Sequence, residues 1–144
     1  MKVTLLLADH AQVADGKLFI SGASWDFASI GRLACGVGVI FHVPWDDSGR
    51  RIKFTIRLVD AGGEPVMRGE SGADTPIEVS GEFEVGRPAH GEPGDDLHMP
   101  VAFNAQLQLK PGLYTWQVEI DGQVTDDWRW SFRVCGTTPS STDI

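Results

Sequence analysis

Residues 101–134 read VAFNAQLQLKPGLYTWQVEIDGQVTDDWRWSFRV, and apolar and polar side chains alternate along three segments of this stretch. The apolar sets are Val101, Phe103, Ala105, Leu107 and Leu109; Tyr114, Trp116, Val118 and Ile120; and Trp128, Trp130, Phe132 and Val134. A period of two places one set of side chains on a buried face and the other set in water. Lys110-Pro111-Gly112 and Asp121-Gly122 supply sharp turns between the segments. The stretch therefore predicts strands of an antiparallel sheet with one wet side.

Strand-like patterns extend over the rest of the chain. Residues 34–43 form a nearly unbroken apolar run, which is typical of a central strand buried on both faces. Residues 22–33 are ambiguous, and their glycine and serine content favours a loop whose aromatic rings cover a sheet end. Asp15-Gly16 predicts a hairpin turn. Further strands are predicted at residues 2–8, 17–21, 52–58 and 77–85.

Eight to ten short strands without any segment of helical period predict an all-β fold. Leu109, Pro111-Gly112 and Tyr114 are similar to the turn before strand F of immunoglobulin-like domains, where a tyrosine hydroxyl binds upstream backbone. This similarity favours an antiparallel β-sandwich, immunoglobulin-like or jelly-roll, over a barrel. We expect a single domain over residues 1–136 and a polar C-terminal tail over residues 137–144.

Charge and hydropathy exclude several classes of partner. The chain of 144 residues has a formal net charge of −8, and its 12 Lys and Arg residues are scattered among 20 acids. Because phosphate binding needs clustered basic residues, no nucleic-acid partner is expected. The apolar run after Lys2 stops at Asp9, short of a signal peptide, and no stretch approaches a membrane span. We expect no signal peptide, synthesis in the cytoplasm and no membrane contact.

Recognisable catalytic and metal-binding motifs are missing from the sequence. The histidines lack HxH or HExxH spacing, there is no GxSxG motif, and Cys35 and Cys135 show no CxxC spacing. The acid pairs Asp46-Asp47, Asp95-Asp96 and Asp126-Asp127 lie at turns, where neighbouring carboxylates point apart. We therefore expect no enzyme activity, no cofactor and no metal. We expect both cysteines to be buried free thiols, and the sequence leaves a disulfide between them as the alternative.

Tryptophans are the most suggestive residue type. Trp116, Trp128 and Trp130 fall on alternating positions and are predicted to lie in the core. Trp25 and Trp45 lie in loop-like segments. Their rings either fold over a sheet end or stay exposed, where they can anchor a protein interface or stack on a sugar.

Several motifs resemble those of a family of small bacterial and bacteriophage proteins of unknown function. These motifs are KVTLLLADHAQV at 2–13, GKL at 16–18, Gly22 and Trp25, VPW at 43–45, GEFEVGRP at 81–88 and PGLYTW at 111–116. The resemblance covers nearly the whole chain and implies a compact β protein without a known activity and without catalytic residues to carry over. The chain departs from it at His10, where an aromatic residue is expected, and in its Ser/Thr-containing tail.

The expected function is that of a non-enzymatic structural or interaction protein that acts through protein contacts. We expect a homo-oligomer or a component of a larger assembly, and the phage side of the resemblance suggests a virion accessory role, in capsid decoration or the tail. The candidate interface residues are Trp25, Trp45, Asn104, Gln106 and Gln108. The last three share an uncharged, amide-rich strand face, which suits a partner better than free water.

The alternative expectation is a small-ligand module for a carbohydrate or calcium. It would use Trp45, Asp46 and Asp47 beside the Asp95-Asp96 loop. Trp45 would stack on a sugar ring, whereas the carboxylates would supply the oxygen ligands that calcium prefers.

Overall fold

The computed structural model describes residues 1–68 and 75–136, so the predicted tail at 137–144 lies outside the described residues. Strands dominate the described ranges, with one short 3-10 helix, η1, after the fifth strand. The elements are β1 (Lys2–Ala8), β2 (His10–Ala14), β3 (Lys17–Ser21), β4 (Phe27–Ser29), β5 (Gly31–Pro44), η1 (Trp45–Asp47), β6 (Arg51–Val59), β7 (Met67–Arg68), β8 (Thr75–Pro76), β9 (Glu78–Glu84), β10 (Asp96–Leu109), β11 (Gly112–Ile120) and β12 (Gln123–Cys135).

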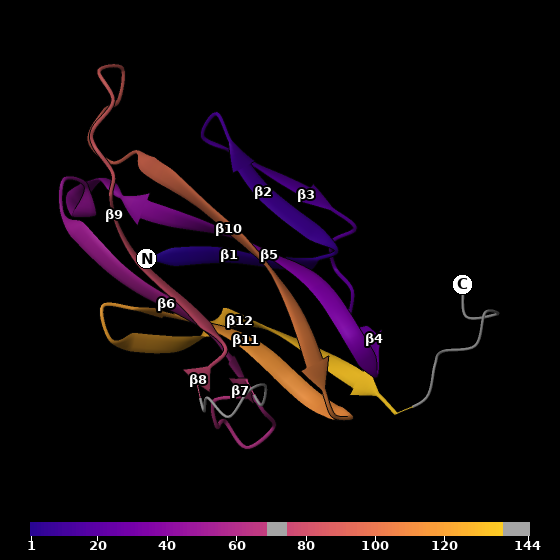
Figure 1. Ribbon diagram of the computed structural model, residues 1–144. Helices are drawn as coiled ribbons and strands as arrows, with labels where there is room; N and C mark the ends of the chain where they lie inside the picture. Colours follow the sequence, from indigo (N-terminus) through magenta and orange to yellow (C-terminus); the bar gives the residue numbers. More distant parts are fainter. Residues whose placement is uncertain (69–74, 137–144) are drawn as a thin grey trace.

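Two main sheets share one core (Figure 1). The smaller sheet has the order β1-β5-β10, and the larger sheet has the order β4-β12-β11-β6-β9. Only the short β4 runs parallel to its neighbour within these two sheets. Aromatic rings join the inner faces: Phe41 lies 5.2 Å from Phe54, and Phe103 lies 5.5 Å from Trp116, between ring centroids.

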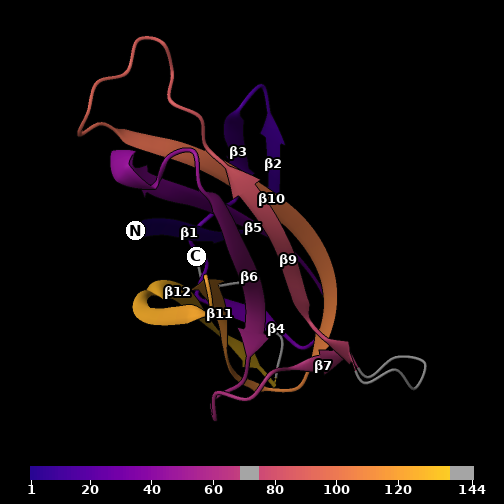
Figure 2. The same ribbon diagram turned by 90° about the vertical axis from the view of Figure 1, so that its left-hand side faces the viewer.

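The all-β, mainly antiparallel fold predicted from the sequence is confirmed. The sheets are curled like a half-open barrel, with β10 strongly bent (Figure 2), so the sandwich subtype stays a prediction. The described ranges hold twelve strands rather than eight to ten. The difference comes from very short strands such as β4, β7 and β8, which have three, two and two residues and are too short to show a period.

The fifth strand is central, as the apolar run predicted. Its odd-numbered residues over 35–43 are buried on the inner face. On the outer face the β2–β3 hairpin forms a third layer over Gly36 and Gly38. An added Cβ would lie 2.5 Å from the amide nitrogen of Ala11 at Gly36, and 2.6 Å from Cδ1 of Ile20 at Gly38. The two glycines therefore allow the hairpin to approach the sheet closely.

The turn after β10 carries the chain from one sheet to the other. β10 and β11 are consecutive, yet β10 pairs with β5 and β11 pairs with β6 and β12. The expectation that the alternating strands form one sheet is therefore wrong for β10. The hydroxyl of Tyr114 donates a hydrogen bond of 2.8 Å to the carbonyl oxygen of Lys110. This is the backbone contact that the similarity to immunoglobulin-like turns predicted.

Two further observations bear on the sequence predictions. None of the helices in the described ranges is long and apolar enough to cross a membrane. Cys35 and Cys135, which both lie in the described part, are free, with Cys35 buried and Cys135 half-buried. Burial raises the pKa of the Cys35 thiol to about 11, so this thiol is protonated at neutral pH.

Candidate functional site: a seam between two strand edges

β9 and β10 each form the edge of a sheet and face one another across a gap in the hydrogen-bonded framework. Within residues 1–68 and 75–136, β9 pairs only with β6, and β10 pairs only with β5. Over the ranges that the structure describes, no backbone hydrogen bond joins the two edges. We call this open joint the seam. Its walls are Val79 and Phe83 on β9 and Val101, Phe103 and Ala105 on β10.

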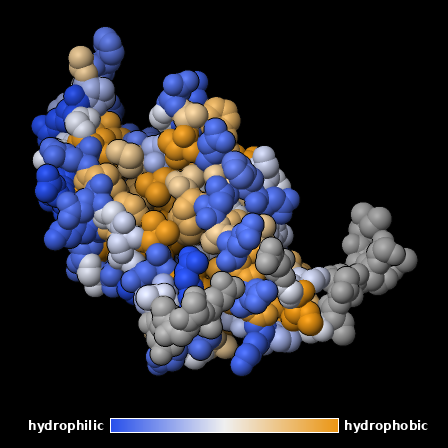
Figure 3. Space-filling view, viewed as in Figure 1, coloured by the Kyte–Doolittle hydropathy of each residue, from blue (hydrophilic) through white to orange (hydrophobic). Residues whose placement is uncertain are grey.

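The walls of the seam are apolar and partly open to solvent. All five wall residues are half-buried, and four of them, Phe83, Val101, Phe103 and Ala105, pack against the core from its margin. In Figure 3 apolar surface is gathered in the middle of this face, with hydrophilic surface along its left side. Incomplete burial of a row of large apolar side chains beside a free strand edge is typical of an interaction surface.

A cavity of about 70 Å³ lies in the seam, where the two strands come together. Val79 contributes from β9 and Phe103 and Ala105 contribute from β10, while Trp116 of β11 forms part of the wall. The Trp116 side chain is 1% exposed. Its indole Nε1 is buried and has no hydrogen-bond acceptor among residues 1–68 and 75–136. A buried donor without an acceptor is unusual in a folded protein.

Charge separates the outer faces of the two edges. On β9, Glu78 pairs with Arg57 of β6 at 2.9 Å, and Glu82 lies 3.6 Å from Arg51 and 3.9 Å from Lys53. The acidic set of β9 is therefore largely neutralised by the neighbouring strand. On β10, no Lys, Arg, Asp or Glu occurs between positions 97 and 109.

The three predicted interface amides, Asn104, Gln106 and Gln108, lie on the outer face of β10, but their side chains have different surroundings. Gln106 and Gln108 are exposed on this edge strand. The Asn104 side chain instead holds the hairpin: its Oδ1 accepts from the Ala11 amide at 3.0 Å, and its Nδ2 donates to the Ala11 carbonyl at 2.8 Å. Because Ala11 is 93 residues away in sequence, alternation alone could not reveal this contact.

Trp45 lies at the other end of β5, in η1. The Arg87 guanidinium lies over its half-buried ring, 4.7 Å from the ring centroid. Asp47 lies 3.6 Å from Arg50. The register brings Asp96 opposite Pro44, so the two acidic loops do come close. Among the described side chains, however, no group of three or more His, Cys, Asp and Glu could hold a metal ion.

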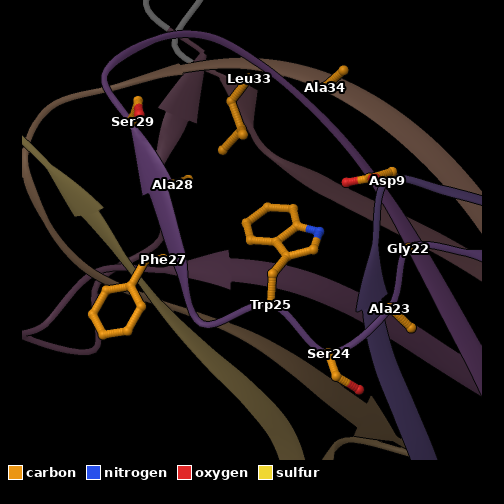
Figure 4. A pocket seen from close by; sticks show the side chains of 10 residues that line it. All are labelled: Asp9, Gly22, Ala23, Ser24, Trp25, Phe27, Ala28, Ser29, Leu33 and Ala34. Carbon is orange, nitrogen blue, oxygen red and sulfur yellow. The ribbon is translucent and has the colours of Figure 1, made fainter. Parts of the chain in front are cut away.

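Trp25 lines a separate open pocket of about 480 Å³, together with Asp9, Ser24, Ser29 and Leu33 (Figure 4). Phe132 lies edge-on to the Trp25 ring, with the centroids 5.7 Å apart. In Figure 4 the indole nitrogen is on the side of the ring that faces Asp9. This nitrogen is also buried without an acceptor in the described chain. Trp25 therefore belongs to a pocket wall.

Sequence reasoning missed a pair of histidines on the outer face of the smaller sheet. His42 and His98 are register partners on β5 and β10, with ring centroids 4.9 Å apart. Nε2 of His42 lies 2.8 Å from the Thr4 hydroxyl. Burial, and then the positive charges of His98 and Lys2, lower the pKa of His42 below 6.5. Only the strand register, which no local spacing contains, could have shown this pair.

Comparison with known proteins gives a family match. Residues 3–134 match a protein family described as "Family of unknown function (DUF6941)". No curated protein matches the chain, and no solved structure does. The predicted resemblance to a family of unknown function is confirmed, whereas its bacterial and bacteriophage origin stays a prediction.

Proposed function

Since the chain belongs to this family of unknown function, we propose its role from the seam: it is a non-enzymatic interaction protein that receives an extended segment along the edge of β10. The observation that carries the proposal is the pair of free edges over a half-buried apolar row. An added strand would satisfy edge backbone groups and cover the apolar side chains together.

The length and chemistry of β10 support this proposal. β10 has 14 residues, and its exposed outer side chains include the amides of Gln106 and Gln108. Natural edge strands are usually shortened or protected by charges. β9, with its three glutamates, follows that pattern, whereas β10 has no charged side chain after Asp96 and carries one edge-protecting proline, Pro100. We therefore propose β10 as the edge that pairs.

We propose a larger assembly as the setting, either a homo-oligomer or a complex with another protein. The concrete form is a virion accessory component, in capsid decoration or the tail, and the sequence resemblance is what supports it. Pairing along one strand edge suits such a role because it joins subunits without requiring a deep pocket.

Gln106→Pro tests the proposal at the edge. Pro100 already lies in β10 opposite Ile40, so even-numbered residues of β10 should direct their N–H groups away from β5. Proline at 106 should keep the pairing with β5 and remove a donor from the free edge. Gln106→Ala, which keeps that donor, is the matched control.

Size-exclusion chromatography with light scattering measures the outcome. Wild-type protein and Gln106→Ala should form an oligomer or a stoichiometric complex, and Gln106→Pro should lose it while keeping its circular dichroism spectrum. A wild-type protein that is strictly monomeric and co-purifies with no partner would count against the proposed function.

A small-ligand role is a second candidate, and the pocket at Trp25 is the observation that favours it. An aromatic ring, the Asp9 carboxylate and two serine hydroxyls line a space large enough for a sugar. Thermal shift with a panel of monosaccharides and disaccharides tests this role. A stabilisation that disappears in Asp9→Asn would support it, and no shift with any sugar would reject it.

A further inference from the structure

We propose that the segment received by the seam comes from another protein, is neutral or basic, and places a side-chain hydrogen-bond acceptor against Trp116. This inference rests on the proposed function and names the chemistry of the partner. It is carried by three features of the seam: the orphan indole N–H of Trp116, the small cavity that Trp116 lines and the distribution of charge.

The first feature is the indole of Trp116. Phe103 of β10 lies edge-on to this ring, with centroids 5.5 Å apart. The indole Nε1 is a donor only, is buried, and finds no acceptor within the described chain. Burying a donor without an acceptor opposes folding. An acceptor that arrives with a partner would remove this penalty, so the position favours binding of a polar group.

The second feature is the size and location of the cavity. It lies between Ile77 and Val79 on one side and Phe103 and Ala105 on the other, and Arg68 and Glu78 also line it. Phe103 and Ala105 are separated by two positions, so β10 directs alternate side chains to this level. An extended segment in the seam would likewise direct every second side chain inward. A volume of about 70 Å³ is roughly that of two water molecules, which suits a short polar side chain such as Asn or Thr.

The third feature is charge. Glu84 at the end of β9 and Asp95 and Asp96 at the start of β10 leave carboxylates where the two strands connect. The whole chain has a formal charge of −8, and a second copy would bring the same charge. Electrostatics therefore disfavour self-pairing and favour a neutral or basic partner segment.

Three labelled synthetic peptides of equal length serve as probes. Each alternates Thr on the outer positions with Val on the inner positions. The first has lysines at both ends and Asn at the central inner position, the second replaces that Asn by Leu, and the third replaces the lysines by Glu. Fluorescence anisotropy against wild-type protein and Trp116→Phe gives the affinities.

The Asn peptide should bind wild-type protein about tenfold more tightly than the Leu peptide, and this preference should disappear in Trp116→Phe. The lysine-ended peptide should bind more tightly than the Glu-ended one, with a difference that shrinks at high salt. In ¹⁵N-labelled wild-type protein, one of the five indole N–H resonances should move downfield with the Asn peptide. This spectrum keeps the test valid if Trp116→Phe folds poorly.

The outcomes separate the inference from the proposed function. Equal binding of the Asn and Leu peptides would overturn the acceptor at Trp116 and leave strand addition standing. A peptide of residues 97–109 that binds more tightly than all three probes would identify a second copy as the occupant. Absence of binding by every peptide would reject strand addition itself.

Discussion

Asn104 shows how one side chain can join two layers of this fold. Its carboxamide accepts a hydrogen bond from the Ala11 N–H and donates one to the Ala11 carbonyl, as a neighbouring strand would. Ala11 itself is 1% exposed. The hairpin packs on a sheet that offers it glycines rather than bulky side chains. The amide of Asn104 is therefore a specific contact that fixes the position of the hairpin.

We predict that Asn104→Ala lowers the free energy of unfolding by about 1–2 kcal/mol, because two hydrogen bonds to the Ala11 backbone are lost. Urea unfolding measures the change. Gln106→Ala, on the same face of the same strand, should change the free energy by less than about 0.5 kcal/mol. Equal effects of the two substitutions would show that Asn104 is only another exposed polar residue.

Single residues also mark the limit of prediction from the sequence. Alternation correctly placed Asn104 on the outer face of a strand, but it could not show that a distant hairpin covers that position. Trp116 was correctly predicted to be buried. That its indole N–H lacks an acceptor depends on what neighbouring strands bring to it, and a sequence pattern contains no such information.

At the scale of elements, the turn between β10 and β11 matters most, because it carries the chain between the sheets. Tyr114 is buried at 9% exposure and fixes this turn through its hydroxyl. It is the single tyrosine of the chain. The pattern Leu109, Pro111-Gly112, Tyr114 predicted this contact because it is local.

We predict that Tyr114→Phe lowers the free energy of unfolding by about 1 kcal/mol, since the Lys110 carbonyl loses its donor while the ring stays in place. Chemical denaturation followed by tryptophan fluorescence gives the value. A change in a neighbouring core ring, such as Phe132→Leu, would not serve as a control, because it removes core packing rather than a hydrogen bond. Gln117→Ala, on the outer face of the same strand, is the control. A Tyr114→Phe protein as stable as wild type would show that the bond is not needed at the turn.

The identity of the elements could be predicted, but their order in the sheets could not. Periods of two gave most strands and their buried faces, because these depend only on neighbouring residues. The side-by-side order β4-β12-β11-β6-β9 depends on long-range pairing. For this reason the acidic face of β9 was expected, but its ion pairs with β6 were not. The seam was missed too, since an edge is defined only once the order is known.

At the scale of the whole molecule, the histidine pair predicts how stability depends on pH. Burial, His98 and Lys2 lower the pKa of His42 in the folded state, and Asp96 opposes them. The unfolded chain then binds more protons than the folded chain as the pH falls below 6.5. This contribution to stability is complete above pH 6.5 and is lost as the pH falls from there toward the folded-state pKa.

Thermal unfolding of wild-type protein and His42→Gln across pH 5 to 8 measures this dependence. The melting temperature of wild-type protein should fall on the acid side, and the fall should be smaller in His42→Gln. His10→Gln, at the exposed base of the hairpin, should keep the wild-type slope. Parallel curves for wild type and His42→Gln would contradict the assignment.

The β2–β3 hairpin has a practical consequence for anyone who needs to attach something to this protein. Its base is held by Asn104, while its tip at Asp15-Gly16 is exposed, and a Cβ at Gly16 would meet nothing within 4 Å. A fluorophore or an epitope inserted at that tip would extend into solvent. The tip of the hairpin is thus a suitable attachment site for immobilising the molecule in a search for its partner.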